Sequence, residues 1–235
     1  EMGAGAMPYL ASALQAKDSH LDTLYLRLYK QLPDAFAKTL PTPLPASQLR
    51  QQAAAGLAVF GPEAKAAVPL LIRALQDPDS RLRMQVVSAL AVVAPDSAAV
   101  RTALKNSLAD QDSWVRLLAA ARLRQISPPD DLELVVDTLV ELLAVPLPGL
   151  NASAARELGQ IGPRAKLAVP LLARALKHPS SQLRENAVCA LAAIGEGSEV
   201  AVPILLEALD DTNHLVRLST VQALEKFGPA ARAAV

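Results

Sequence analysis

The sequence predicts an all-α fold, a right-handed superhelix of stacked helical hairpins. Three observations support this: a recurring arginine, several columns of leucine, and near copies of one short segment. The arginine stands at Arg50, Arg83, Arg116, Arg184 and Arg217, each eleven residues before a position where a helix would end. The spacing is 33 residues, except for one gap of 68 in which Asn151 takes the arginine's place. A period of this size is typical of repeats that pack only on their neighbours.

The first half of each repeat is predicted to be a helix. One leucine column contains Leu57, Leu90, Leu123, Leu158, Leu191 and Leu224, and apolar residues lie three positions before and after each member. Such spacing places all of them on one helical face. Glycine or another turn residue, often followed by proline, ends the helix. Serines three residues before the arginine, at Ser47, Ser80, Ser113 and Ser181, are the expected N-caps.

The second half of each repeat is predicted to be a second helix. The segments AVPLLIRAL (67–75), AVPLLARAL (168–176) and AVPILLEAL (201–209) are near copies. Proline stands early in each, where a helix loses no backbone hydrogen bond. Two further leucine columns follow, at Leu71, Leu104, Leu139, Leu172 and Leu205, and four residues later at Leu75, Leu108, Leu143, Leu176 and Leu209. Each repeat is therefore helix A, turn, helix B, turn.

These residues resemble a known family. The combined pattern D-x-x-(L/V)-R, A-L-x-x-I-G-P and A-V-P-x-L-x-x-A-L resembles HEAT repeats of the short bacterial type that is named after phycobilisome lyase subunits. The resemblance covers residues 46–235 well and residues 1–18 in part. It implies the superhelical fold. For function it implies little, because some relatives are chromophore lyases and many others are scaffolds.

The repeat pattern divides the chain into three parts. We expect a partial N-terminal repeat over 1–18, an irregular helical insertion over 19–45, and an array of about five full repeats over 46–235, the last one truncated. Because neither end resembles a polar capping repeat, we expect a fragment of a longer array. The insertion contains Tyr25 and Tyr29, which either fill the junction with the array or bind a partner.

Composition argues against several classes of function. The 235 residues include 23 basic and 23 acidic residues, and this balance argues against a nucleic-acid or anionic-membrane surface. No unbroken apolar run of membrane-spanning length occurs. One cysteine, Cys189, excludes an internal disulfide and leaves the compartment open, with the cytoplasm slightly favoured. No catalytic, cofactor-binding or metal-ligating motif is found, so we expect neither an enzyme nor a cofactor.

The candidate binding residues lie on the expected outward side of the B helices. This column reads Arg73, Asn106, Glu141, Arg174 and Glu207. Its charges alternate in sign, which suits either a mixed polar peptide or protein partner or an ordinary solvated face. Trp114, near the start of a helix A, is either a binding hot spot or a residue that packs on the neighbouring turn.

The remaining charged positions are interpreted as structural. The arginines are expected to bond to acidic side chains or turn carbonyls of a neighbouring repeat rather than to phosphate. Arg122 and Glu157 occupy the same column of two adjacent repeats, so they are predicted to pair across the interface. The sequence thus favours a non-catalytic protein-interaction scaffold. A lyase or lyase-chaperone subunit and a nucleic-acid-binding array remain as alternatives.

Overall fold

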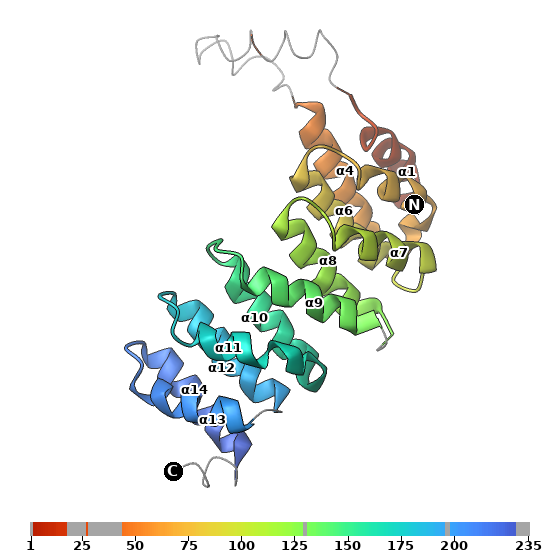
Figure 1. Ribbon diagram of the computed structural model, residues 1–235. Helices are drawn as coiled ribbons and strands as arrows, with labels where there is room; N and C mark the ends of the chain where they lie inside the picture. The colour runs from red at the N-terminus through yellow and green to blue at the C-terminus, as the bar shows by residue number, and fades with distance from the viewer. Residues whose placement is uncertain (1, 18–26, 28–43, 129–130, 196–197, 229–235) are drawn as a thin grey trace. The chain divides into compact units, whose positions relative to one another are not determined.

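The computed structural model describes residues 2–17, 27, 44–128, 131–195 and 198–228 (Figure 1). All regular secondary structure in these residues is helical, which confirms the all-α prediction. The chain forms two compact units, 1–103 and 104–235. Each unit is a stack of helical hairpins. The predicted insertion lies almost wholly outside the described residues, and so do Tyr25 and Tyr29.

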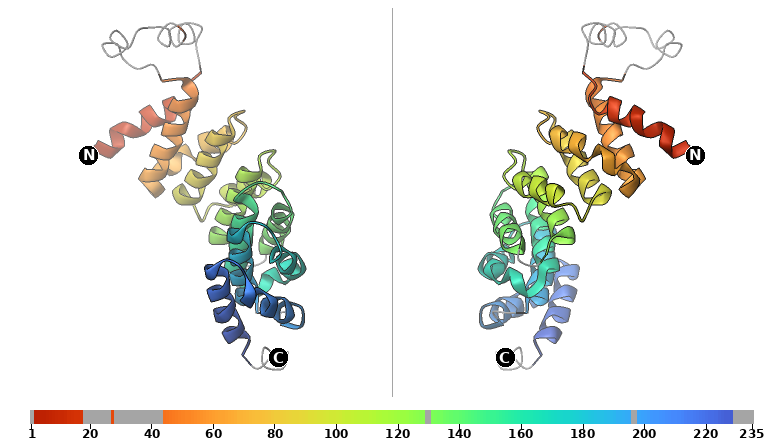
Figure 2. Two further views of the ribbon diagram at one scale, coloured as in Figure 1. Left: turned by 90° about the vertical axis from the view of Figure 1, so that its left-hand side faces the viewer. Right: turned by 90° about the vertical axis from the view of Figure 1, so that its right-hand side faces the viewer.

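The first unit begins with helix α1 (Met2–Ala13). Its other elements are α4 (Ala46–Phe60), the 3₁₀ helix η1 (Gly61–Ala67), α5 (Val68–Ala74), α6 (Ser80–Val93) and the first part of α7 (Ala98–Ser107). Helix α4 packs on α1 and on α6, and α5 packs on α6. In both views of Figure 2 the red helix α1 lies beside the orange helix α4. Here α4 and α6 are A helices, while α1, α5 and α7 are B helices.

The second unit contains the following elements: α8 (Ser113–Ile126), α9 (Leu132–Leu143), α10 (Leu150–Ile161), the 3₁₀ helix η3 (Gly162–Ala168), α11 (Val169–Ala175), α12 (Ser181–Ile194), α13 (Ser198–Glu207), the 3₁₀ helix η4 (Ala208–Asp210) and α14 (His214–Phe227). The A helices α8, α10, α12 and α14 pack in that order, each on the next (Figure 1). Among the B helices, α9 packs on α8 and α10, while α11 packs on α12 and α13. This is the predicted stack of hairpins.

Helices α6, α8 and α12 begin one residue earlier than the serine column predicts, and α4 begins two residues earlier, with Pro45 at its N-cap. The N-caps of α6, α8, α12 and α14 are Asp79, Asp112, Ser180 and Asn213. Each side chain accepts a hydrogen bond from a backbone N–H of the first turn. The serines at 80, 113 and 181 are therefore the first helical residues. The side-chain oxygen of the residue one position earlier, a carboxylate at Asp79 and Asp112 and a hydroxyl at Ser180, satisfies the free backbone donors instead.

The A helices differ in how they end, and a Gly-Pro pair at the end gives helix B a 3₁₀ start. At Gly61 and Gly162 the backbone takes a positive φ of 56° and 73°, a region open to glycine. A Gly-Pro pair then leads into the 3₁₀ helices η1 and η3. Ala94 and Ser127 keep negative φ angles of −150° and −94°. After Ala94, α7 begins at Ala98 without a 3₁₀ segment before it, whereas Asp131, directly before α9, has 3₁₀ geometry.

The core consists of the predicted leucine columns. In the A helices the leucines at 57, 90, 123, 158 and 191 are at most 1% exposed. In the B helices the first leucine column is fully buried at all five positions. Small residues such as Ala54 and Ala155 fill the space between them without exposure. Burial fails at the end of the second unit, where Val221 is 46% exposed although its counterpart Val188 is fully buried.

One helical run in the described part of the chain, Ala46–Ala74, is long and apolar enough to cross a membrane by length and composition. The run is not one straight helix. At Gly61 the backbone leaves the helical region, with φ 56° and ψ −133°, and α4 packs on α1 and α6. It is therefore the A–B hairpin of one repeat.

Candidate binding surface

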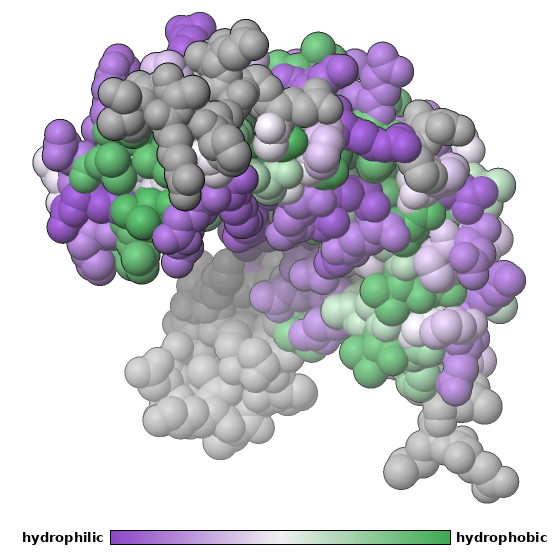
Figure 3. Space-filling model, turned by 90° about the horizontal axis from the view of Figure 1, so that it is seen from below, coloured by the Kyte–Doolittle hydropathy of each residue, from purple (hydrophilic) through white to green (hydrophobic). Residues whose placement is uncertain are grey.

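The outward column of the B helices is exposed at every position. Its members are Arg73, Asn106, Glu141, Arg174 and Glu207. In the second unit Lys177 Nζ lies 3.1 Å from Glu207 Oε2. This ion pair links neighbouring B helices and neutralises part of the surface. On the face seen in Figure 3, hydrophobic residues form separate groups among hydrophilic ones. Exposure permits a binding role, which stays a prediction.

A hollow of about 600 Å³ lies in the first unit, where the C-terminal ends of α1 and α5 meet; we call it the α1–α5 hollow. Leu14 and Leu70 supply apolar wall, while Lys17 and Arg73 supply cationic groups. A second hollow of about 470 Å³ lies beside it and is lined by Tyr9 and Leu49. Only Arg73 was a candidate from the sequence. Lys17 carries no pattern of its own and becomes notable only through its place beside α5.

The recurring arginines fasten each helix A to the turn that precedes it. Nη1 of Arg184 donates to the carbonyls of His178 and Pro179 at 2.9 and 3.0 Å. Arg83, Arg116 and Arg217 make the equivalent bonds. Each donates to the two carbonyls that lie six and five residues before it in the sequence. These carbonyls belong to the end of the preceding B helix and its turn. The guanidinium thus satisfies backbone acceptors that the helix end leaves free.

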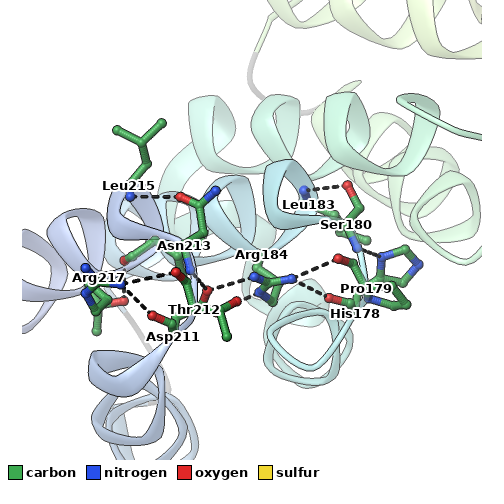
Figure 4. Close-up of polar contacts among 12 residues, drawn as sticks. His178, Pro179, Ser180, Leu183, Arg184, Asp211, Thr212, Asn213, Leu215 and Arg217 are labelled. Atoms are coloured by element: carbon green, nitrogen blue, oxygen red, sulfur yellow. Dashed lines mark hydrogen bonds and ion pairs between the residues drawn. The ribbon is translucent and has the colours of Figure 1, made fainter.

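Arg184 also reaches forward to the next turn. Its Nε and Nη2 lie 2.6 and 2.7 Å from the two carboxylate oxygens of Asp211, a forked ion pair (Figure 4). Asp211 in turn accepts the backbone N–H of Asn213 at 2.8 Å. The hydrogen bond from Arg184 lowers the pKa of Asp211, and the bond to Asp211 raises the pKa of Arg184. Arg184 thereby links α12 to two turns, the one that precedes α12 and the one that precedes α14.

Arg50 shows the same arrangement across the predicted insertion. Its Nε lies 3.0 Å from Asp77 Oδ2 in the next turn, 27 residues ahead, as Asp211 lies ahead of Arg184. Its Nη1 donates to the carbonyl of Ala16 at 2.9 Å. Ala16 follows α1 as Asp77 follows α5. Helix α1 therefore occupies the place of a B helix beside α4. The partial repeat over 1–18 stays a prediction.

The predicted pair between Arg122 and Glu157 is wrong. Glu157 pairs with Arg124, whose Nε lies 3.1 Å from Oε2, and Arg124 also donates to Gln160. Arg122 instead donates to Gln125 of its own helix at 3.1 Å. Both members of the observed pair are largely covered, with side-chain exposures of 20% and 10%.

The error comes from matching equal columns of adjacent helices. Arg124 meets a residue two columns earlier on α10, because the neighbouring A helices do not align residue for residue. The next interface has the same offset. A Cβ added at Gly159 of α10 would stand 2.9 Å from the Cα of Ala190, which is also two columns earlier on α12. Inclined helix packing produces such shifts.

Trp114 lies against the neighbouring turn. Its Cη2 is 3.7 Å from the position that a Cβ on Gly149 would take, in the turn before α10. The side chain is nevertheless 39% exposed. The contact matches the packing alternative, and the exposed part of the ring leaves the binding alternative open.

Cys189 is an exposed free thiol. His178 Nδ1 accepts the backbone N–H of Ser180, which gives this histidine a turn-forming role. Across the described ranges, no group of three or more His, Cys, Asp or Glu side chains is placed to hold a metal ion.

The family model for HEAT repeats matches residues 44–124 and 136–225. The chain belongs to the HEAT-repeat family. No curated protein matches this HEAT-repeat chain.

Solved structures share the HEAT-repeat fold. A designed armadillo repeat protein in complex with the peptide (KR)4 has a TM-score of 0.62 at 20% identity, covering 89% of this chain and 100% of that one. An engineered protein has a TM-score of 0.56 at 26% identity, covering 78% and 92%. The complex of CpcE and CpcF of phycocyanin lyase from Nostoc sp. PCC7120 has a TM-score of 0.54 at 22% identity, covering 69% and 65%. At such identities the likeness shows the fold.

Proposed function

We propose that this HEAT-repeat chain is a non-catalytic scaffold that binds a segment of another protein along its B helices. The observation that carries the proposal is the outward column, which is exposed in every described repeat and contains polar and charged side chains of both signs. The opposite sides of the same helices are held by buried leucines. Within each unit, the stacked B helices hold these polar groups in an array that suits an extended polypeptide, whose side chains recur at a regular interval.

The armadillo likeness supports a peptide as the class of partner. The designed protein of similar fold holds the peptide (KR)4. The alternatives have less support. A lyase has only the fold likeness to CpcE and CpcF behind it. A nucleic-acid surface would need cations in excess, whereas Glu141 and the Lys177–Glu207 pair interrupt the column in the second unit.

Selection from a display library of random peptides on the full chain tests the proposal. We expect bound peptides to protect amides of α9, α11 and α13 from hydrogen exchange. Arg174→Ala should weaken a peptide bound there about tenfold, because Arg174 is exposed on the column. The matched control is Arg156→Ala on α10, where an arginine with 59% side-chain exposure lies on a helix A.

Two results would contradict the scaffold proposal. One is a library that gives no specific binder at all. The other is a set of binders that protect only the A helices and that respond to Arg156→Ala rather than to Arg174→Ala.

A further inference from the structure

The α1–α5 hollow differs from the rest of the outward surface in its charge. Its wall contains three cationic side chains, those of Lys17, Arg50 and Arg73, and one carboxylate, that of Asp77. Two of these groups neutralise each other, since Arg50 Nε lies 3.0 Å from Asp77 Oδ2. Asp77 is further occupied by the backbone N–H of Asp79, at 2.9 Å. This pair is part of the repeat's own framework.

Lys17 and Arg73 remain without an acidic partner among the residues that the structure describes. Neither makes a hydrogen bond or an ion pair there, and both are exposed at the wall of the hollow. The nearby carboxylate of Asp79 caps α6 through Arg81 N and accepts from Gln51, at 3.0 and 2.7 Å. Within the described part of the chain, the hollow thus presents two positive charges without a paired carboxylate.

The corresponding place in the second unit has a smaller excess, because one of its two cations is paired. Arg174 occupies the column position of Arg73, and Lys177 follows it by one turn. There Lys177 pairs with Glu207 from the next B helix at 3.1 Å. A positive groove is therefore a property of the α1–α5 hollow and does not follow from the repeat itself.

The floor and wall of the hollow also offer apolar surface. Leu14 is 4% exposed at the end of α1, and the half-buried Leu70 and Ala74 face the same space from α5. A volume of about 600 Å³ lies in the range of ordinary ligand sites. Apolar surface beside two free cations suits a ligand that combines carboxylates with a hydrophobic side chain.

We propose that the α1–α5 hollow binds an acidic segment of a partner polypeptide, with its carboxylates on Lys17 and Arg73 and an apolar side chain against Leu14 and Leu70. This inference rests on the proposed scaffold function and specifies one partner chemistry for it. The planar guanidinium of Arg73 can hold one carboxylate through two hydrogen bonds, while Lys17 supplies a mobile point charge. A nucleic acid fits less well, because two cations beside leucine offer its phosphates little.

Fluorescence anisotropy with short labelled peptides tests the proposal on the full chain. The probe is a peptide of glutamates around one central leucine, compared with the same peptide carrying glutamine or lysine in place of glutamate. We expect the glutamate peptide to bind at least tenfold more tightly than the glutamine peptide, and the advantage to shrink at higher salt. Replacing the central leucine with serine should also weaken binding.

Substitutions locate the bound peptide. Arg73→Ala and Lys17→Ala should each weaken the glutamate peptide about five- to tenfold, and Arg73→Lys should restore part of the loss. Arg156→Ala on α10 is the control, since it removes an exposed arginine from a helix A outside the hollow. Arg73, Lys17 and Arg156 are exposed, so the variants should keep the helical circular dichroism of the parent.

The inference is overturned if the glutamate and glutamine peptides bind equally, or if Arg73→Ala leaves the affinity unchanged. It is also overturned if a single-stranded oligonucleotide binds more tightly than the glutamate peptide and loses affinity in the same variants, which would assign the hollow to phosphate. Random-library peptides that still bind the B helices would then show that the scaffold function stands while this partner chemistry does not.

Discussion

Helices α12 and α14 are copies of one design, 33 residues apart, but they have different surroundings. Helix α12 packs between α10 and α14, whereas α14 has a neighbouring A helix on one side in the described residues. Val188 of α12 is fully buried, and its counterpart Val221 is 46% exposed. Leu215 and Leu218 extend the exposed apolar face of α14. The comparison shows that the burial of a residue, and so its contribution to stability, depends on whether a neighbouring helix covers it rather than on the repeat motif that it shares.

The largest effect should come from the leucine column. We expect Leu191→Ala in α12 to cost about 3–5 kcal/mol of unfolding free energy, because the side chain is fully buried and leaves a cavity. Leu224→Ala in α14 should cost about half as much, since Leu224 is half-buried. Urea denaturation, combined with hydrogen exchange of α12 and α14, measures both losses. Equal losses would contradict the claim that the neighbour decides.

The next largest losses of stability should come from substitutions of the recurring arginines. We expect Arg184→Ala to cost about 2–3 kcal/mol, because it leaves the largely covered Asp211 without its forked partner. Arg217→Ala should cost about 1 kcal/mol, since within the described residues Arg217 donates only to the carbonyls of Asp211 and Thr212. Denaturation of the two variants gives the difference. A larger loss for Arg217→Ala would place the main link elsewhere.

The same ion pair predicts a pH dependence. The folded-state pKa of Asp211 lies below its ordinary value, so its contribution is fully present above the unfolded pKa, at about pH 4 and higher. It is lost as pH falls from there through the folded pKa. The stability gap between the parent and Asp211→Asn should therefore be widest near neutral pH and close below about pH 4. A gap that stays constant down to pH 2 would show that Asp211 acts through packing alone.

The interface between α10 and α12 leaves little room at Gly159. We expect Gly159→Ala in α10 to cost about 1–2 kcal/mol, because the added Cβ would stand 2.9 Å from the Cα of Ala190 on α12. The equivalent position one repeat later, on α12, is already alanine, Ala192. The control is Gly56→Ala, whose Cβ would meet only the side-chain end of Leu10, at 3.0 Å. The control should be neutral or slightly stabilising, since alanine favours the helix, and thermal denaturation compares the two.

The sequence was sufficient to predict the fold because residues that recur at the same place in every repeat mark the buried positions. A leucine such as Leu123 recurs only if it meets the same surroundings in every unit, so the columns identified the core. The same logic failed where packing depends on geometry between helices. Column matching placed Glu157 opposite Arg122, whereas the inclined helices bring Arg124 to it.

The candidate site could be predicted only in part, for a related reason. The outward column follows from periodicity, and so Arg73 could be named. The α1–α5 hollow depends on how the last turn of α1 stands beside α5, and no pattern in the sequence around Lys17 reports this. Likewise, the forward link from Arg184 to Asp211 required knowing that positions 27 residues apart meet through adjacent turns.

The smallest expected loss of stability comes from the N-caps, and here α14 should lose more than α12. At the start of α14, Asn213 Oδ1 accepts from Leu215 N at 2.9 Å, whereas at the start of α12 Ser180 Oγ accepts from Leu183 N at 3.5 Å. We expect Asn213→Ala to cost about 1 kcal/mol and Ser180→Ala only a few tenths, because a long hydrogen bond satisfies the first turn poorly. Hydrogen exchange of the first-turn amides of each helix measures the effect locally. If Ser180→Ala proved the more costly, two-sided packing would amplify even a weak cap, and the neighbour rule would extend from the core to the helix ends.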